Sequence, residues 1–184
     1  MAITIRPETT ADFPAIEAVT AAAFLNAPHT SHTEQFIINA LRTAGQLTLS
    51  LVAEENSEIV GHIAISPVTI SGENLQWYGL GPVSVTPERQ GRGIGSELVR
   101  QALARMRQLG AAGCVVLGEP HYYGRFGFTA TPNLVLPGVP PEYFQAILLN
   151  LNATSPTGVV SYHEAFNARP PTSTADTPPV APGC

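Results

Sequence analysis

A glycine-rich loop at residues 90–96 has the residue types and spacing of a phosphate-binding turn. Glycines stand at positions 91, 93 and 95, and the amphipathic segment 96–109 that follows predicts a helix. The first turn of a helix has backbone N–H groups without partners, and the helix dipole places partial positive charge there. Each glycine costs about 1 kcal/mol of ordering relative to alanine, so a close approach of the backbone to a ligand is expected. The loop therefore predicts a site for a phosphorylated ligand at the helix entrance.

Three kinds of phosphate-binding loop fit such a position, and the residues exclude or disfavour two. A Walker-type loop requires Gly-Lys-Ser/Thr, which is absent here. A dinucleotide fingerprint needs Gly or Ala where Ser96 stands, and its turn leaves the strand directly, whereas residues 86–90 intervene here. A cradle for the pyrophosphate of a nucleotide-containing thioester remains. The alternative without a ligand is a tight connection between a strand and a helix.

The elements around this loop predict a mixed α/β protein. Ile3 and Ile5 alternate with polar residues and predict a short strand, and two segments with helical spacing of apolar residues follow it. Alternating residues around a turn at 56–58 predict a hairpin, which is followed by another strand. The expected order is strand 3–5, helices 12–23 and 34–45, strands 47–53, 59–65 and 77–85, helix 96–109, and a buried strand 114–117. This order contains a βαβ unit around the glycine loop.

The C-terminal third is less regular. We expect a helix over 141–149, with proline in its first turn, and a strand over 159–162. Residues 1–168 are expected to form one domain. The segment 169–184 is rich in proline and poor in apolar bulk, which predicts a mobile tail.

Composition narrows the class of protein. Of the 184 residues, 44% are hydrophobic and 12% are charged, as expected for a globular enzyme. A net charge of −5 argues against a nucleic-acid binder that works by bulk charge, although five arginines cluster between positions 89 and 107. No apolar run is long enough for a membrane span, and no leader is recognised. Cys114 and Cys184 imply no disulfide framework, and no acid and histidine spacing resembles a metal site, so we expect a cytoplasmic protein without a metal.

Two motifs together resemble the GNAT superfamily of acetyl-coenzyme A-dependent N-acetyltransferases. The superfamily pattern Q/R-x-x-G-x-G/A is matched by Gln90, Gly93 and Gly95, after a strand that ends in Val-Thr-Pro-Glu. The pattern Tyr-x-x-x-Gly-Phe is matched by residues 123–128. The longer phrase over 117–128, together with Tyr-His-Glu-Ala-Phe at 162–166, looks like the bacterial YhbS-type branch of predicted acetyltransferases.

This resemblance implies a fold, a donor substrate and a reaction. The fold would be a mixed, largely antiparallel central sheet flanked by helices. Acetyl-CoA would be the co-substrate, an amine of unidentified identity the acceptor, and a homodimer is possible for this fold. The donor would contact the strand before the loop and the loop itself, at Val83, Ser84, Val85, Gln90, Gly91, Arg92, Gly93, Ile94, Gly95 and Ser96. Two other functions remain open: a CoA-binding sensor with little turnover, and a transferase for a longer acyl group.

The resemblance also implies two catalytic residues. Tyr123 corresponds to the usual general acid, since a phenol stays protonated at neutral pH and can protonate a leaving thiolate. Its alternative role is packing at the start of a short helix. Glu119 is a candidate general base, and its alternative role is capping that helix. His62, His121 and Glu34 are weaker candidates for the base or for the acceptor site.

Overall fold

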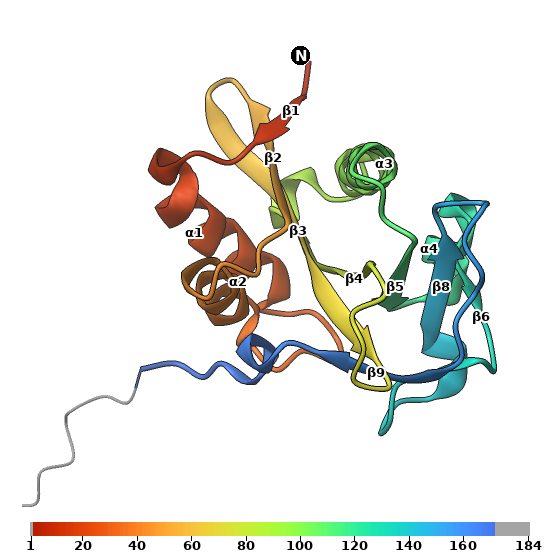
Figure 1. Ribbon diagram of the computed structural model, residues 1–184. Coiled ribbons are helices and arrows are strands. Elements are labelled where there is room, and N and C mark those ends of the chain that lie inside the picture. Colours follow the sequence, from red (N-terminus) through yellow and green to blue (C-terminus); the bar gives the residue numbers. More distant parts are fainter. Residues whose placement is uncertain (1, 172–184) are drawn as a thin grey trace, which may run out of the picture.

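The computed structural model describes residues 2–171, and its centre is a twisted mixed sheet. Antiparallel pairing joins β1 (Thr4–Pro7), β2 (Leu49–Glu55), β3 (Glu58–Ile70) and β4 (Trp77–Val85) in chain order (Figure 1). β5 (Gly113–Leu117) then pairs parallel to β4, and β8 (Phe144–Leu148) and β6 (Thr129–Ala130) continue the sheet antiparallel. β9 (Gly158–Tyr162) pairs with the end of β3 and with β7 (Leu134–Val135).

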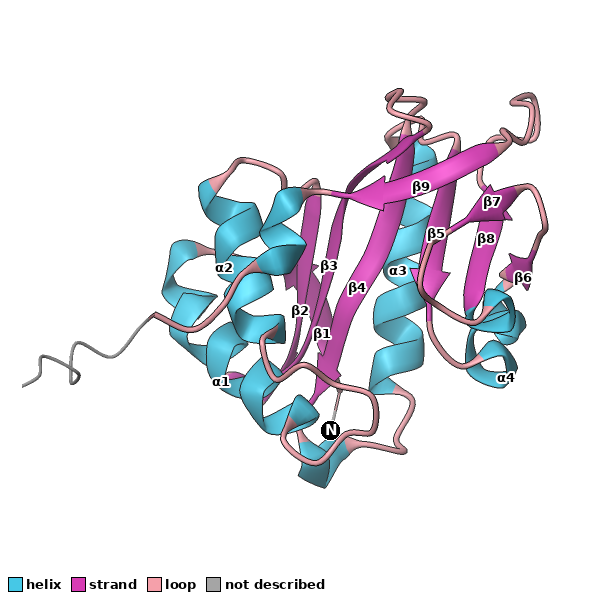
Figure 2. Ribbon diagram, turned by 90° about the horizontal axis from the view of Figure 1, so that it is seen from below, coloured by secondary structure: helices cyan, strands magenta, loops and turns pink. Residues whose placement is uncertain are grey.

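Helices cover both faces of this sheet. α1 (Phe13–Phe24) and α2 (Glu34–Thr43) lie on one face, and α3 (Ile94–Gln108) lies on the other (Figure 2). β9 crosses the sheet on the α1 and α2 side (Figure 2). The short α4 (Pro120–Tyr123) follows β5. The predicted fold class, a largely antiparallel sheet with a βαβ unit, is confirmed.

The α3 face is an apolar core. Leu98, Val99, Ala102, Leu103 and Met106 of α3 are buried against sheet residues of one cluster. These positions recur at helical spacing, which is why the sequence predicts this helix so well. Cys114 lies in the same cluster, fully buried, and burial raises the pKa of its thiol to about 12. This cysteine is therefore a small core residue.

The strands β4 and β5 separate after a short paired stretch, and this fork is the main irregularity of the sheet. They pair only at Trp77↔Gly113, Tyr78↔Cys114 and Gly79↔Val115. Beyond this point β4 bulges, because Leu80 lies opposite Ile65 and Val83 opposite Ile63, which leaves an extra residue on β4. Among residues 2–171, no strand pairs with the β5-facing edge of β4 beyond Gly79. The backbone of that edge is available to a ligand.

The prediction of a helix over 141–149 is wrong. Pro141 begins only a 3-10 turn, Pro141–Tyr143, and the next five residues form β8 along the whole of β5. Phe144, Gln145 and Ala146 are buried in succession, so the run is covered on both faces and has no period that distinguishes strand from helix. The sequence also predicts a mobile tail over residues 169–184, and most of that segment lies outside the described residues.

Candidate functional site

The glycine loop enters α3 through two residues in left-handed conformation. Gly91 has φ of 74° and Gly93 has φ of 81°, a region that favours glycine. The N–H of Glu97 is the first in the helix to bond back, to the Gly93 carbonyl at 3.0 Å. The N–H groups of Ile94, Gly95 and Ser96 therefore belong to the open first turn, where an anion is favoured.

Side chains before the loop fix it to the sheet. The Gln90 amide donates a hydrogen bond of 3.0 Å to the Val85 carbonyl at the end of β4. Arg89 forms an ion pair with Glu55 of β2, and this contact raises the pKa of Arg89 and lowers that of Glu55. Arg92 is exposed at the tip of the loop. Gln90 is one of the predicted donor contacts. In the structure its side chain fixes the loop to β4, and this bond explains its position without a contact to a ligand.

A cavity of about 390 Å³ opens in front of this helix entrance. Its lining residues are Val85, Arg89, Gln90, Gly91, Gly93, Ile94, Gly95, Ser96, Tyr122 and Arg125. Arg89, Tyr122 and Arg125 are not among the predicted donor contacts. The Tyr122 hydroxyl lies 3.5 Å from Ser96 Oγ, and a Cβ on Gly95 would come within 3.1 Å of it. Arg125 covers the Tyr122 ring at 4.4 Å from the centroid, and its Nε donates to the Tyr122 carbonyl.

Val83, Ser84 and Val85 lead from the fork to this cavity. Val83 and Val85 pack into the α3-side cluster, whereas Ser84 is buried on the other face opposite His62. Their side chains are thus engaged in the two cores, and what they present to the fork is backbone. The unpaired edge of β4 runs from the fork to Val85, and Val85 lines the cavity at the α3 entrance; this edge and the cavity together form a track.

The two adjacent tyrosines of α4 have different surroundings. Tyr122 reaches the α3 entrance, while Tyr123 packs edge-on against Phe128 and lies over Gly118, where a Cβ would be 2.3 Å from the ring. Burial raises the pKa of the Tyr123 hydroxyl, so this phenol is protonated throughout the neutral range. Gly118, the residue after β5, therefore leaves room for the Tyr123 ring beside the fork.

The structure does not show the capping role for Glu119. It is the N-cap residue of α4, but its side chain makes no cap hydrogen bond, and it is exposed. His121, the next candidate along the chain, is also exposed. Glu34 accepts hydrogen bonds from the Thr30 hydroxyl and the Ser31 N–H, so one of its oxygens holds the loop before α2.

His62 lies in a buried polar network on the α1 and α2 face. Its Nε2 is 2.7 Å from Ser50 Oγ, and Ser50 donates at 2.7 Å to Glu8, which pairs with Arg42. Burial lowers the pKa of His62 to about 4. The imidazole is therefore neutral at neutral pH, and its Nδ1 has no hydrogen-bond partner within the described part of the chain. No local sequence pattern predicts this network, because its members are far apart along the chain.

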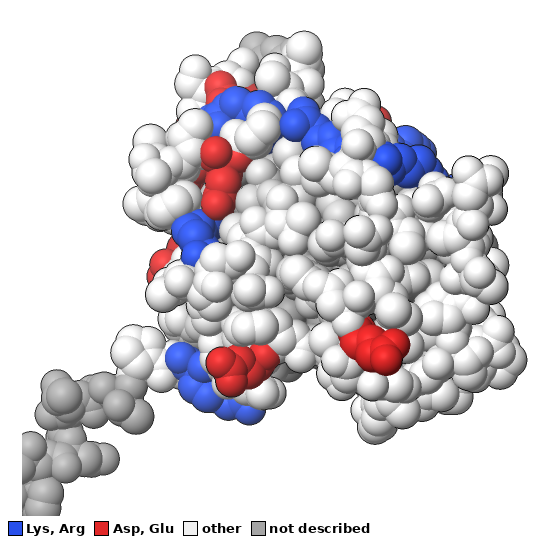
Figure 3. Space-filling model, viewed as in Figure 1, with Lys and Arg blue, Asp and Glu red and all other residues white. Residues whose placement is uncertain are grey.

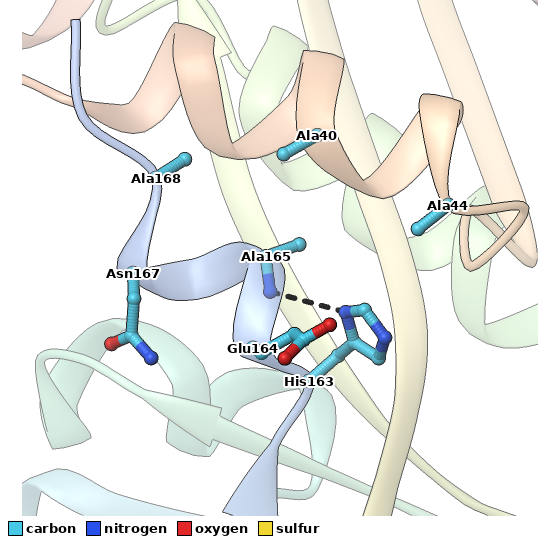
Figure 4. Close-up of a pocket in the computed structure, with 7 residues that line it drawn as sticks. All are labelled: Ala40, Ala44, His163, Glu164, Ala165, Asn167 and Ala168. Atoms are coloured by element: carbon cyan, nitrogen blue, oxygen red, sulfur yellow. Dashed lines mark hydrogen bonds between the residues drawn. The ribbon is translucent and has the colours of Figure 1, made fainter.

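Two further hollows lie on the α1 and α2 side. One of about 300 Å³ lies where α2 meets the 3-10 turn η5 (Glu164–Asn167), and Figure 4 shows that alanines of both segments line it. Another of about 440 Å³ lies along α1 and the start of α2.

Within residues 2–171 no group of acids, histidines or cysteines could hold a metal ion, and no helix is long and apolar enough to cross a membrane. On the face shown in Figure 3, basic side chains lie along the upper edge, and further charged side chains of both signs lie at the left and in the lower part.

Comparison with known proteins defines the class of protein. Residues 4–131 match the model of the acetyltransferase (GNAT) domain. The chain belongs to this family, and the predicted resemblance is confirmed.

The relatives then define a branch of the family. The chain is 36% identical over 168 residues to the uncharacterized N-acetyltransferase YhbS of Escherichia coli K12, which covers 89% of this chain and 98% of that protein. A crystal structure of E. coli YhbS in complex with CoA has a TM-score of 0.81 at 37% identity, over 90% of this chain and 92% of the other. A GNAT family acetyltransferase from Brucella melitensis, in complex with acetyl-CoA, has a TM-score of 0.80 at 48% identity, over 90% and 98%. The predicted YhbS-like branch is therefore confirmed.

Proposed function

We propose that this protein transfers an acetyl group from acetyl-CoA to an amine. The observation that carries the proposal is the continuous track from the α3 entrance to the unpaired edge of β4, with Val85 at their junction. A diphosphate at the open first turn and an amide-containing arm along the strand edge are the two parts of CoA that such a track suits. The complexes of the two similar proteins with CoA and acetyl-CoA support this assignment.

The loop residues hold the donor in this proposal. The N–H groups from Gly91 to Ser96 bind the pyrophosphate, and the backbone of 83–85 pairs with the arm as an added strand. Arg125, which lines the cavity, and Arg92, which is exposed on the loop, supply positive charge, while Arg89 is already paired with Glu55. Tyr122 joins this donor site, since its hydroxyl lies at Ser96.

The chemical step needs a proton at sulfur, and Tyr123 supplies it. The amine nitrogen forms the new C–N bond, the C–S bond breaks, and the phenol proton moves to the departing sulfur. Burial raises the pKa of Tyr123, but it raises a thiol pKa as well, as at nearby Cys114. Burial in the fork therefore favours the protonated form of both groups, and the phenol keeps its proton until negative charge develops on the departing sulfur.

Glu119 is the proposed acceptor of the proton lost by the amine. It is exposed at the end of β5 and its side chain makes no cap bond, so it is free to take that proton directly or through water. The proton then returns through solvent to the phenolate of Tyr123. We also propose that residues 1–168 form one domain; the homodimer and the cytoplasmic location remain predictions.

Two measurements test this function. Titration calorimetry with acetyl-CoA tests the donor site, and thiol release from acetyl-CoA in the presence of a panel of primary amines tests the reaction. The sequence contains no lysine, so the protein itself offers no lysine side chain as a competing acceptor. Acetyl-CoA binding without thiol release for any amine would indicate the alternative, a CoA-binding sensor. Failure to bind acetyl-CoA would refute the proposal.

A further inference from the structure

The fork between β4 and β5 is closed where the two strands begin to pair. Gly79 and Val115 form the last pair before the strands separate, so an arm that lies along β4 from Val85 can advance no farther than this pair. On the proposed function, on which this inference rests, the acyl group of the donor lies at this closed end. A longer acyl chain must then extend from the fork toward one of the two faces of the sheet.

One of these faces is filled by the apolar core. Leu80, Cys114, Val116 and Phe128 are buried there in one cluster with α3. Such cores are close-packed and do not accept added methylenes without strain. An acyl chain is therefore directed to the α1 and α2 face.

On that face the closed end is covered by Tyr162 of β9. Tyr162 lies opposite Val68 of β3, and its ring rests on Gly79, where a Cβ would be 2.5 Å from Cε1. Burial raises the pKa of this phenol, so it is neutral in the neutral range. Tyr162 of β9 and Tyr123 of α4 thus lie at the fork although they come from different parts of the chain.

The residues that follow hold this ring in place. Phe166 packs on it with 4.8 Å between centroids. His163 Nδ1 accepts a hydrogen bond of 3.1 Å from the Ala165 N–H, and Ala165 is buried against Ile37 and Leu41 of α2 (Figure 4 shows the His163 bond). The motif at 162–166, which the donor site does not use, therefore fixes Tyr162 to α2.

We propose that Tyr162 limits the length of the acyl group and makes this protein selective for short acyl donors. The ring touches the backbone of Gly79 with no space between them, and Phe166 backs it. A chain longer than acetyl must displace the ring, and overpacking of this kind costs about 1–3 kcal/mol, or about 5- to 150-fold in affinity.

The test needs no knowledge of the acceptor. Dissociation constants of CoA, acetyl-CoA, butyryl-CoA and hexanoyl-CoA are measured by calorimetry for the wild type, Tyr162→Phe and Tyr162→Ala. We expect hexanoyl-CoA to bind the wild type at least about tenfold more weakly than acetyl-CoA. Tyr162→Phe keeps the ring and should keep this ratio, whereas Tyr162→Ala should reduce it to about threefold or less, with CoA affinity retained.

Three outcomes would overturn the proposal. Equal affinity of the wild type for acetyl-CoA and hexanoyl-CoA would show that nothing limits chain length. An unchanged ratio in Tyr162→Ala, with CoA still bound, would show that another residue does so. If thermal unfolding shows that Tyr162→Ala is not folded, Tyr162→Leu replaces it under the same criteria. Loss of CoA binding by the wild type would instead refute the proposed function itself, and this inference with it.

Discussion

The two faces of the sheet differ in how they are built. The α3 face is an apolar core with the glycine loop at one end, and this loop is a single run of neighbouring residues, 90–96. The α1 and α2 face buries polar groups, including Thr20, Ser50, His62, Ser66 and Ser84. Its main network joins Glu8, Arg42, Ser50 and His62 from three strands or loops and a helix. Local sequence thus specifies the donor side, whereas only the folded chain assembles the opposite side.

The adjacent tyrosines of α4 give the largest expected effect. Tyr123→Phe removes the proposed acid and should lower turnover about 10²- to 10⁴-fold, with acetyl-CoA affinity unchanged. Tyr122→Phe is the matched control, because it removes the same atom from the neighbouring ring at the donor loop. It should change acetyl-CoA affinity more than turnover. Steady-state thiol release and calorimetry measure both, and equal turnover of Tyr123→Phe and the wild type would exclude the acid role.

The same contrast explains what sequence could predict. The glycine spacing at 91, 93 and 95 and the helical period after it are local patterns, so the loop, α3 and the strand before them were predicted within about two residues. Phe144–Leu148 was misread as helix, because a short apolar run buried on both faces carries no period, and its pairing with β5 is a long-range contact. The place of Tyr122 at the donor loop and the place of Tyr162 at the fork were not predicted, because the first depends on the direction of one side chain and the second on a strand crossing the sheet.

His62 tests whether the polar face limits stability at low pH. Burial lowers its pKa to about 4, below the 6.5 of an exposed histidine. The unfolded chain therefore binds the proton more tightly than the folded chain. The contribution of the neutral imidazole to the free energy of unfolding is fully present above pH 6.5, and it is lost as pH drops from 6.5 toward 4. Between pH 7 and pH 5 this loss is about 2 kcal/mol.

Replacement by an uncharged residue should remove this pH dependence. Urea unfolding of His62→Gln at pH 7 and pH 5 should show a difference smaller by about 2 kcal/mol than that of the wild type. Glu8 also contributes, but its pKa is lowered, so its effect falls below pH 4.5 and outside this window. His163, which caps a surface turn, provides a comparison in His163→Gln. The same pH dependence in His62→Gln and the wild type would contradict a buried neutral imidazole.

The smallest effect compares one glycine from each face. Gly93, at the entrance of α3, and Gly45, after α2, both have positive φ, 81° and 67°, and a Cβ on either would meet nothing within 4 Å. The cost of alanine at both is therefore backbone strain alone, about 1–2 kcal/mol, and the two variants should lose similar stability in urea. Only Gly93→Ala should weaken acetyl-CoA binding, by about 5- to 30-fold, because its loop relaxes away from the conformation that aims the N–H groups at the phosphates. Calorimetry on both variants separates backbone strain from ligand binding. If Gly93→Ala binds acetyl-CoA as tightly as Gly45→Ala, the backbone of this loop does not hold the pyrophosphate. The loop would then not be the local sequence feature that distinguishes the donor side from the opposite face.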